Sequence, residues 1–318
     1  MFYTKTSIMN RVALVFLLFT VFHVSAFSQT DYSIPEEAQR IVFLGNSITY
    51  SGQYISYVEA YYRLKHPLRE LEWINVGLPS ETVSGLSEEN HAGGAFPRPD
   101  LHERLNRVFE RLNPDVVFVN YGMNDGIYLP LDEGRFQKYK DGINWLHGEI
   151  IAISAYAIFV TPPVYDPKKG AAYANVLDNY SDWLLSRRYT AGWKVIDIHW
   201  PMRNYLEDQR ALDSAYFLAK DGVHPGEIGH WLMAKEILLA LGESEVKDFN
   251  DIHEALAAFS HGEEVLSLIS KRQMLLRDAW LTSTGHVRPG LAPGVALEEA
   301  QALANEIESQ LTQLLLNN

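Results

Sequence analysis

The sequence contains no cysteine. This absence excludes disulfide bonds, thiolate metal sites, a cysteine nucleophile and a lipidated cysteine at a cleavage point. Basic residues are scarce, since 27 Lys and Arg stand against 40 Asp and Glu, for a net charge of −13. Nucleic-acid binders are typically basic, and an acidic surface repels anionic lipid headgroups. The composition therefore predicts neither a nucleic-acid-binding nor a lipid-surface-binding protein.

Long hydrophobic runs are missing as well. The longest, residues 12–22, follows two cationic residues, and it is well short of the roughly 20 apolar residues that a helix needs to cross a bilayer. Small residues after it suit cleavage behind Ala26 or Ser28. We therefore predict a signal peptide over residues 1–28 and a mature protein in the periplasm or outside the cell, without a stable membrane anchor. A retained N-terminal anchor is the alternative.

Several cofactor and enzyme motifs are also absent. The sequence has no P-loop and no dinucleotide-binding fingerprint, so no cofactor is predicted. Its histidines lack the paired spacing of a zinc-binding helix, so no metal site is predicted. It has no Gly-x-Ser-x-Gly, which argues against the nucleophile elbow of α/β-hydrolases.

Short segments rich in β-branched and aromatic residues alternate with longer segments of helical period over residues 36–242. This alternation is typical of β-α-β units and predicts a buried parallel sheet of five strands in a three-layer α/β/α sandwich. The expected strands are Ile41–Leu44, Leu71–Val76, Asp115–Asn120, Ile151–Val160 and Lys194–Ile198. The expected helices are Tyr54–Lys65, Leu101–Leu112, Gly134–Ile150, Ala171–Arg188 and Ile228–Leu241.

The strand pattern stops near Gly242. Residues 243–318 carry helical signals over 252–281 and 297–315, and the second of these repeats apolar residues at steps of three and four. We predict a C-terminal helical extension that folds onto the sheet domain, with a dimer contact as the alternative. The oligomeric state itself is not predicted.

In open parallel sheets, ligands bind beyond the carboxyl ends of the strands. The first predicted strand runs into Gly45, Asn46 and Ser47, so the Ser47 hydroxyl lies at a strand-to-helix turn. This hydroxyl is a candidate nucleophile if a base lies near it. The structural alternative is a helix N-cap, for which serine is a preferred residue.

Asp221 and His224 lie three residues apart in a loop that contains glycine and proline. Such a loop can let the carboxylate accept a hydrogen bond from one imidazole nitrogen while the other nitrogen faces outward as a base. Because that base must be neutral, activity is expected to rise with pH through the range in which imidazole titrates. The alternative is a turn in which Asp221 bonds the backbone and His224 is a surface residue.

Two further segments follow predicted strands. Gly77 follows the second strand and Asn124 follows the third. A glycine backbone N–H and an amide side chain are neutral donors that can be in place before the negative charge of an oxyanion develops. Both residues are therefore candidates for an oxyanion hole.

In chain order, Ser47, Gly77, Asn124, Asp221 and His224 resemble the four sequence blocks of the SGNH (GDSL-like) hydrolase family. The resemblance covers about residues 40–241. It implies a flavodoxin-like sandwich with five parallel strands, in which Ser47 is the nucleophile and His224 is the base oriented by Asp221. It also implies an oxyanion hole formed by the N–H groups of Ser47 and Gly77 and the side-chain amide of Asn124.

The sequence departs from the family pattern at two positions. Asn46 replaces the usual aspartate before the nucleophile, and Ser80 replaces the later glycine of the second block. Asn46 has no proton-transfer role, so we expect activity to persist.

The resemblance implies a serine esterase. Export, acidity, the absence of a long apolar lid and the habits of exported relatives favour removal of small acyl groups, foremost acetyl, from a small-molecule or polysaccharide ester. The alternatives are a lysophospholipase or other lipid esterase, an O-acyltransferase, and a non-catalytic binding protein.

Three residues are candidates for binding the substrate. Arg98, in a polar loop after the second strand, would hold a carboxylate or sulfate of the substrate or pair with a local acid. His286 and Arg288, in the loop between the two helical segments of the extension, would cap the crevice or lie in a surface loop.

Overall fold

A computed structural model describes residue 1 and residues 32–316 of the chain. The predicted signal peptide, residues 1–28, lies outside the described residues except for Met1. Residues 32–316 belong to one compact unit.

Five parallel strands form one sheet, in the order β2-β1-β3-β4-β5. Their bounds are β1 Arg40–Gly45, β2 Glu72–Asn75, β3 Val116–Asn120, β4 Tyr156–Val160 and β5 Lys194–Ile196. The middle strands β1 and β3 are almost entirely buried, as expected for a parallel sheet covered on both faces. The predicted five-stranded α/β/α sandwich is confirmed.

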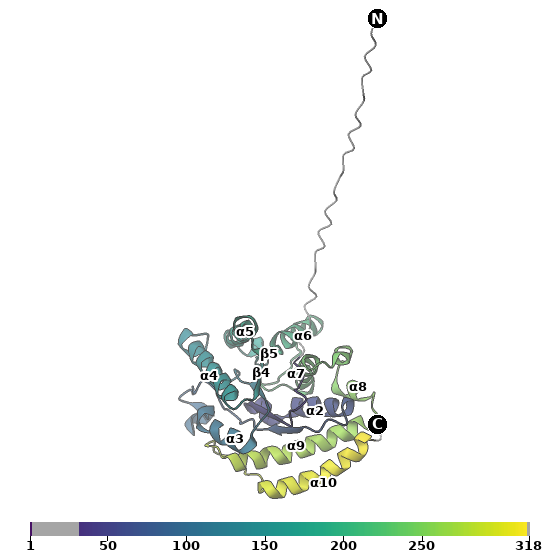
Figure 1. Ribbon diagram of the computed structural model, residues 1–318. Coiled ribbons are helices and arrows are strands. Elements are labelled where there is room, and N and C mark those ends of the chain that lie inside the picture. The colour runs from purple at the N-terminus through teal and green to yellow at the C-terminus, as the bar shows by residue number, and fades with distance from the viewer. Residues whose placement is uncertain (2–31, 317–318) are drawn as a thin grey trace. The chain divides into compact units, whose positions relative to one another are not determined.

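Ten α-helices surround this sheet within the described residues (Figure 1). Their bounds are α1 Ser47–Ser51, α2 Gln53–Lys65, α3 Leu105–Leu112, α4 Glu133–Ala152, α5 Pro167–Thr190, α6 His199–Leu212, α7 Glu227–Ala240, α8 Ile252–Leu256, α9 Gly262–Thr284 and α10 Leu297–Leu316. The described residues also contain three short 3₁₀ turns, His91–Gly94, Leu101–Glu103 and Ser244–Asp248.

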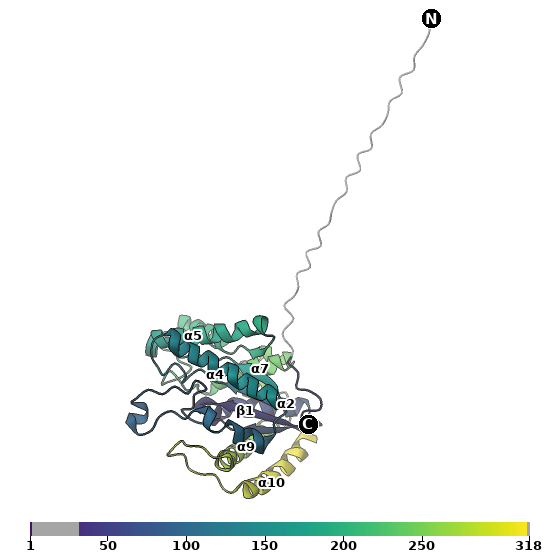
Figure 2. The same cartoon turned by 60° about the vertical axis from the view of Figure 1, so that its left-hand side comes forward.

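The order of the strands determines where the helices lie. The chain moves from β1 outward to β2, and then returns past β1 to β3, β4 and β5. Right-handed crossovers therefore place α2 on one face, where it packs against α7, and α4 and α5 together on the other (Figure 2). The direction reverses between β1 and β3, and a reversal of this kind opens a ligand crevice at the carboxyl ends of the two strands.

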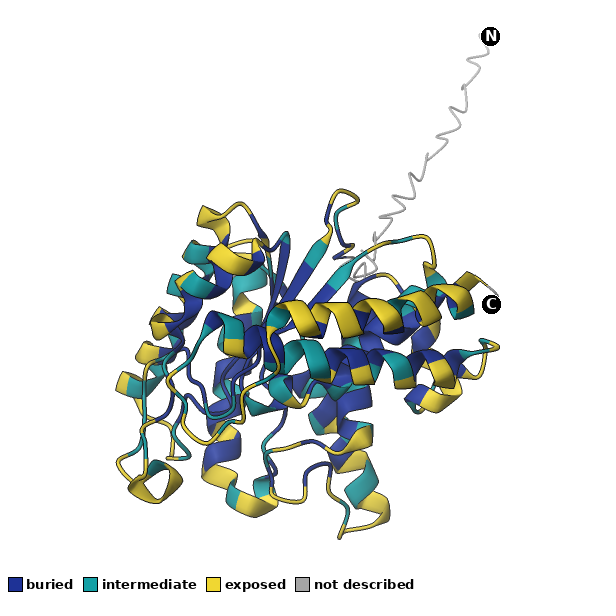
Figure 3. Cartoon of the chain, turned by 90° about the horizontal axis from the view of Figure 1, so that it is seen from below, coloured by how far each residue is buried: buried dark blue, intermediate teal, exposed yellow. Residues whose placement is uncertain are grey.

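The C-terminal extension covers the sheet edge at β2. Helix α9 contacts β2, α2 and α3, and α10 packs on α9 with an exposed outer face (Figure 3). Gln273 on α9 donates a hydrogen bond to the Trp73 carbonyl in β2 at 3.0 Å, and Arg107 donates one to the Thr284 carbonyl at 2.8 Å. The extension thus lies on the sheet domain, as expected.

Several predicted boundaries were wrong. The fourth strand starts at Tyr156 and not at Ile151, because α4 continues to Ala152 and the chain turns at Ser154, which has a φ of 62°. The apolar run that suggested a longer strand includes Ile151, which is 52% exposed on the end of the helix.

Other predicted elements are divided in the structure. The predicted helix over 252–281 is two helices, α8 and α9, and the predicted helix over 101–112 is a 3₁₀ turn followed by α3. The fifth strand ends at Ile196, and α6, which was not predicted, follows it. The first backbone N–H groups of α6 find a distant partner, since the Thr161 hydroxyl accepts hydrogen bonds from Ile198 and His199.

Candidate active site

Ser47 is the first residue of α1, directly beyond β1. The residue that caps this helix is Asn46, whose Oδ1 accepts a hydrogen bond from the Ile48 N–H at 3.1 Å. The N-cap alternative for Ser47 is therefore wrong, and its hydroxyl points elsewhere. Ser47 Oγ lies 2.8 Å from His224 Nε2.

Asparagine keeps the capping oxygen that an aspartate would supply, so the departure at Asn46 preserves the start of the helix.

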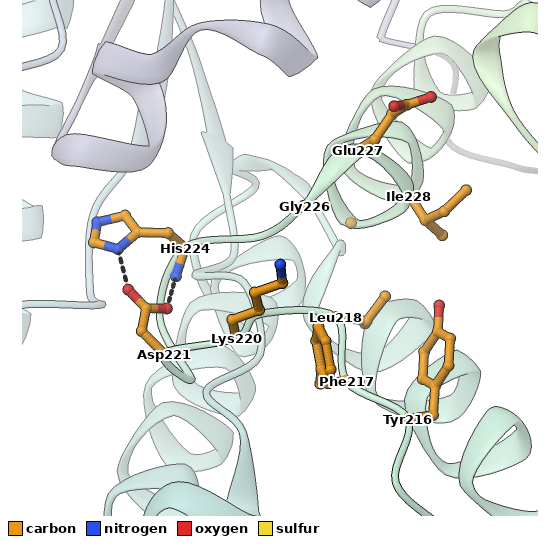
Figure 4. Close-up of a pocket in the computed structure, with 10 residues that line it drawn as sticks. Tyr216, Phe217, Leu218, Lys220, Asp221, His224, Gly226, Glu227 and Ile228 are labelled. Atoms are coloured by element: carbon orange, nitrogen blue, oxygen red, sulfur yellow. Dashed lines mark hydrogen bonds and ion pairs between the residues drawn. The ribbon is translucent and has the colours of Figure 1, made fainter. Parts of the chain in front are cut away.

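Asp221 holds the imidazole from the other side. Its Oδ2 lies 2.6 Å from His224 Nδ1, and its Oδ1 accepts hydrogen bonds from the N–H groups of Val223 and His224 at 2.9 Å each (Figure 4). The turn and the catalytic arrangement, set out above as alternatives, are therefore present together. One oxygen shapes the loop, and the other orients the ring.

The carboxylate of Asp221 is ionised at neutral pH. Partial burial raises its pKa, but hydrogen bonds from the His224 side chain and from the backbone of His224 and Val223 outweigh this and lower the pKa to about 2. A carboxylate acceptor at Nδ1 favours the tautomer with the proton on Nδ1, which leaves Nε2 free to accept a proton from Ser47.

The Gly77 N–H, predicted to serve the oxyanion hole, donates a hydrogen bond to Asn75 Oδ1 at 2.9 Å. Asn75 Nδ2 donates in turn to the Thr49 carbonyl in α1 at 2.7 Å. A Cβ on Gly77 would lie 2.4 Å from the Tyr50 backbone nitrogen. Glycine is therefore needed here for the close approach of this segment to α1, and its N–H is already engaged within the protein.

Ser80, the other departure from the family pattern, has a left-handed backbone with a φ of 70°. Its N–H forms no hydrogen bond to any part of the chain that the structure describes. This N–H is a candidate oxyanion donor that sequence reasoning missed. The available signal was the family's glycine at this position, because a positive φ favours glycine.

Asn124 is buried beyond the end of β3. Its Nδ2 donates a hydrogen bond to the Glu81 carbonyl at 3.1 Å, and its Oδ1 accepts one from the Tyr128 hydroxyl at 3.1 Å. These two contacts fix the orientation of the amide and leave its second N–H for a ligand. Burial raises the pKa of Tyr128 to about 12, so its hydroxyl stays protonated and remains a donor.

Two buried carboxylates support the loops of the site. Asp125 accepts hydrogen bonds from the N–H groups of Gly122, Val83 and Ser84, each at 2.9 Å, and so ties the turn after β3 to the loop after β2. Glu81 forms a two-pronged pair with Arg104 at 2.6 and 2.7 Å. No sequence pattern marks either acid, because neither belongs to the reacting groups.

The predicted substrate residues have different surroundings. Arg98 is buried and makes two hydrogen bonds of 2.7 Å to Glu88, so the alternative of pairing with a local acid is the one observed. Arg288 lies 5.5 Å from the ring centre of Phe96, which brings the loop of the extension against the loop after β2. Within the described residues, His286 Nδ1 and Arg288 Nε have no hydrogen-bond partner.

A pocket of about 480 Å³ adjoins the loop of Asp221 and His224. Figure 4 shows Tyr216, Phe217 and Leu218 on one side of this loop, while the His224 ring extends from the other. Asp221 and His224 thus line this pocket, whereas Ser47 is not among its lining residues.

In residues 32–316, no cluster of three or more His, Asp or Glu side chains is arranged to hold a metal ion. No helix of the described chain is both long enough and apolar enough to cross a membrane.

A hydroxyl, an imidazole and a carboxylate joined in that order at the carboxyl edge of a parallel sheet form the site of a serine hydrolase. The chain belongs to the GDSL-like lipase/acylhydrolase family, whose model matches residues 43–232. It is a carboxylic ester hydrolase. A comparison with curated proteins gave no match.

Solved structures share the fold at low sequence identity. A gut microbial diltiazem-metabolizing enzyme is 22% identical with a TM-score of 0.54, over 67% of this chain and 49% of that one, so the chain spans about half of its length. LAE5, an α/β-hydrolase enzyme from the metagenome of Lake Arreo, Spain, is 24% identical with a TM-score of 0.51, over 64% and 95%. Axe2, an acetylxylan esterase from Geobacillus stearothermophilus, is 20% identical with a TM-score of 0.51, over 64% and 94%.

Proposed function

We propose that the protein is an exported serine esterase that removes small acyl groups, foremost acetyl, from carbohydrate. The observation that carries the esterase chemistry is the contact of 2.8 Å between Ser47 Oγ and His224 Nε2, with Asp221 hydrogen-bonded behind the imidazole. The carbohydrate substrate and the export are the further steps of this proposal.

In the first half of the reaction, His224 Nε2 accepts the Ser47 proton as Oγ attacks the ester carbonyl. The N–H groups of Ser47 and Ser80 and the side-chain amide of Asn124 hold the negative oxygen that forms. His224 then gives its proton to the leaving alcohol, and the acyl group stays on Ser47. Water, deprotonated by His224, releases the acid in the second half.

Four observations support a carbohydrate ester as the substrate. The protein is strongly acidic, which disfavours anionic lipid surfaces, and its N-terminal sequence has the pattern of a signal peptide. The fold is shared with an acetylxylan esterase. Arg288, whose guanidinium lies 5.5 Å from the ring centre of Phe96, and His286, two residues earlier, belong to the loop of the extension that meets the loop after β2. We keep these two residues as candidate contacts to the sugar, whereas Arg98 is satisfied by Glu88.

Two assays test this proposal. The purified mature chain and the Ser47→Ala variant are compared on p-nitrophenyl esters of increasing acyl length, and acetate release is then followed from acetylated xylooligosaccharides. We expect the highest kcat/KM on acetyl esters, with Ser47→Ala lower by roughly 10⁴–10⁶.

Other results would favour a rival function. A rate that climbs with acyl length would favour a lipid esterase, and acyl transfer to an added alcohol with little free acid would favour an acyltransferase. Equal rates for the wild type and Ser47→Ala on every ester would favour a non-catalytic binding protein. N-terminal sequencing of the protein recovered outside the cytoplasm tests the export and the cleavage at Ala26 or Ser28.

A further inference from the structure

Helix α1, which begins with the nucleophile, has only five residues. A helix this short is not stable by itself, so contacts from the rest of the fold decide its orientation. Three of its carbonyls receive side-chain donors, each at 2.7 Å. The Ile48 carbonyl is bonded by the Ser51 hydroxyl, the Thr49 carbonyl by Asn75 Nδ2, and the Tyr50 carbonyl by Arg277 Nη1.

The third donor comes from outside the family's common region. Ser51 and Asn75 lie within residues 43–232, which the family model matches, whereas Arg277 lies on α9 of the C-terminal extension. The extension therefore adds a contact to the nucleophile helix that the family region does not supply.

Arg277 and its neighbour Asp278 hold Tyr50 at three points. The guanidinium carbon of Arg277 lies 3.8 Å from the ring centre of Tyr50, in addition to the bond to its carbonyl. The Tyr50 hydroxyl donates a hydrogen bond to Asp278 Oδ1 at 3.2 Å. Asp278 also accepts from Arg277 Nε at 2.8 Å and Nη2 at 3.1 Å, which fixes the guanidinium plane.

Helix α9 is itself fixed on both sides of Arg277. Gln273, four residues earlier, donates to the Trp73 carbonyl of β2, and the Thr284 carbonyl accepts from Arg107 on α3. The Arg277 side chain is only 11% exposed. The guanidinium is therefore held by an element that is anchored to the same sheet that carries the catalytic residues.

We propose that Arg277 is a positioning residue for Ser47. By binding the carbonyl and the ring of Tyr50, three residues after the nucleophile, it sets the orientation of α1 in which Ser47 Oγ meets His224 Nε2. The C-terminal extension is then part of the catalytic unit and more than a cover for the sheet edge. This inference rests on the proposed serine esterase function.

The test compares Arg277→Gln with a matched control, Arg107→Gln. Both variants remove a guanidinium bond to a backbone carbonyl between the extension and the sheet domain, but only Arg277 touches α1. The readouts are kcat and KM on p-nitrophenyl acetate, the rate at which a fluorophosphonate labels Ser47, and the Tm. Labelling reports the reactivity of the nucleophile even where ester turnover is slow.

We expect Arg277→Gln to lower kcat and the labelling rate about 10- to 100-fold, because a displacement of about 1 Å at a reacting atom has an effect of this size. KM should stay within about twofold, and Arg277→Lys, which keeps the charge and one donor, should recover part of the loss. Arg107→Gln should lower the Tm by a similar amount and leave kcat and labelling within about twofold of wild type.

Two results would overturn the inference. One is wild-type kcat and labelling in Arg277→Gln, and the other is an equal loss in Arg107→Gln, which would mean that the extension acts only through stability. If Arg277→Gln does not fold, Arg277→Lys alone carries the test, with a loss of kcat and labelling expected and wild-type values contradicting it. Failure of the proposed function is a different result, because wild-type protein would then match Ser47→Ala in both ester turnover and labelling.

Discussion

The Tyr128 hydroxyl donates a hydrogen bond of 3.1 Å to Oδ1 of Asn124 and thereby turns the amide nitrogen toward its other partners. Tyr128 and the preceding Ile127 have φ values of 56° and 48°, and a left-handed backbone at a β-branched residue is strained. The fold thus holds an unfavourable backbone next to an oxyanion-hole candidate.

Tyr128→Phe removes this hydrogen bond and keeps the ring. We expect kcat to fall about tenfold with KM nearly unchanged, because an amide that is free to turn stabilises the transition state less well than one that is fixed. Steady-state kinetics on p-nitrophenyl acetate check this. Tyr165→Phe, a change on a neighbouring ring, is the control and should keep the wild-type kcat. An unchanged kcat in Tyr128→Phe would show that Asn124 needs no such partner.

Asp221→Asn tests the orienting carboxylate. We expect kcat to fall by roughly 10³–10⁴, because an amide can donate to His224 Nδ1 and so favour the wrong tautomer. Since the pKa of Asp221 is lowered to about 2, this carboxylate stays ionised well below neutral pH, and its protonation should not set the acid limb of the wild-type pH–rate profile. An acid limb that falls only near pH 2 contradicts this assignment.

His230 should make the protein sensitive to mild acid. It is 3% exposed, and burial together with the nearby charge of His224 lowers its pKa to about 4. Because the unfolded histidine binds a proton near pH 6.5 and the folded one does not, folding stability is lost as the pH falls from about 6.5 to 4.

We expect His230→Phe, which cannot titrate, to escape a loss on the order of 2 kcal/mol between pH 7 and pH 5. Urea unfolding of both proteins at the two pH values measures the difference. Parallel losses in the two proteins would show that His230 does not carry the effect.

The buried pair of Glu81 and Arg104 should be costly to break. Glu81→Gln leaves the guanidinium without its charge partner in a site that is about 1% exposed, which should lower the free energy of unfolding by about 3–5 kcal/mol. The control is Glu72→Gln, which breaks a half-exposed pair with Arg40 and should cost about 0–1 kcal/mol. Denaturant titrations give both values, and similar losses in the two variants contradict the prediction.

Substitutions at Ser80 and Gly77 should change the stability of the protein in opposite directions. Ser80→Gly should raise the free energy of unfolding by about 1 kcal/mol, because it removes a side chain from a left-handed backbone, and activity should be kept. Gly77→Ala should lower stability and activity together, because its Cβ would meet the backbone of α1. Thermal unfolding with the ester assay checks both. A stable and active Gly77→Ala variant would show that the segment at Gly77 does not pack closely against α1.

Local patterns in the sequence were enough for the fold class, and together with the resemblance to the SGNH family they pointed to the reacting groups. Alternation of apolar and helical segments predicted five parallel strands, and the expected order of Ser47, Asp221 and His224 agrees with the contacts of the structure. These features depend on periodicity, on turn residues and on the rule that the carboxyl ends of parallel strands share one edge, all of which are visible within short stretches of sequence.

Only the tertiary structure decided how these groups are supported. The start of α6 depends on the Thr161 hydroxyl, the Gly77 N–H is taken by Asn75, and Arg98 is paired with Glu88. The bond from Arg277 to the Tyr50 carbonyl joins residues that are 227 positions apart. Such contacts form because distant side chains with unused donors and acceptors are brought together when the core closes, and no short-range pattern in the sequence records which of them will meet.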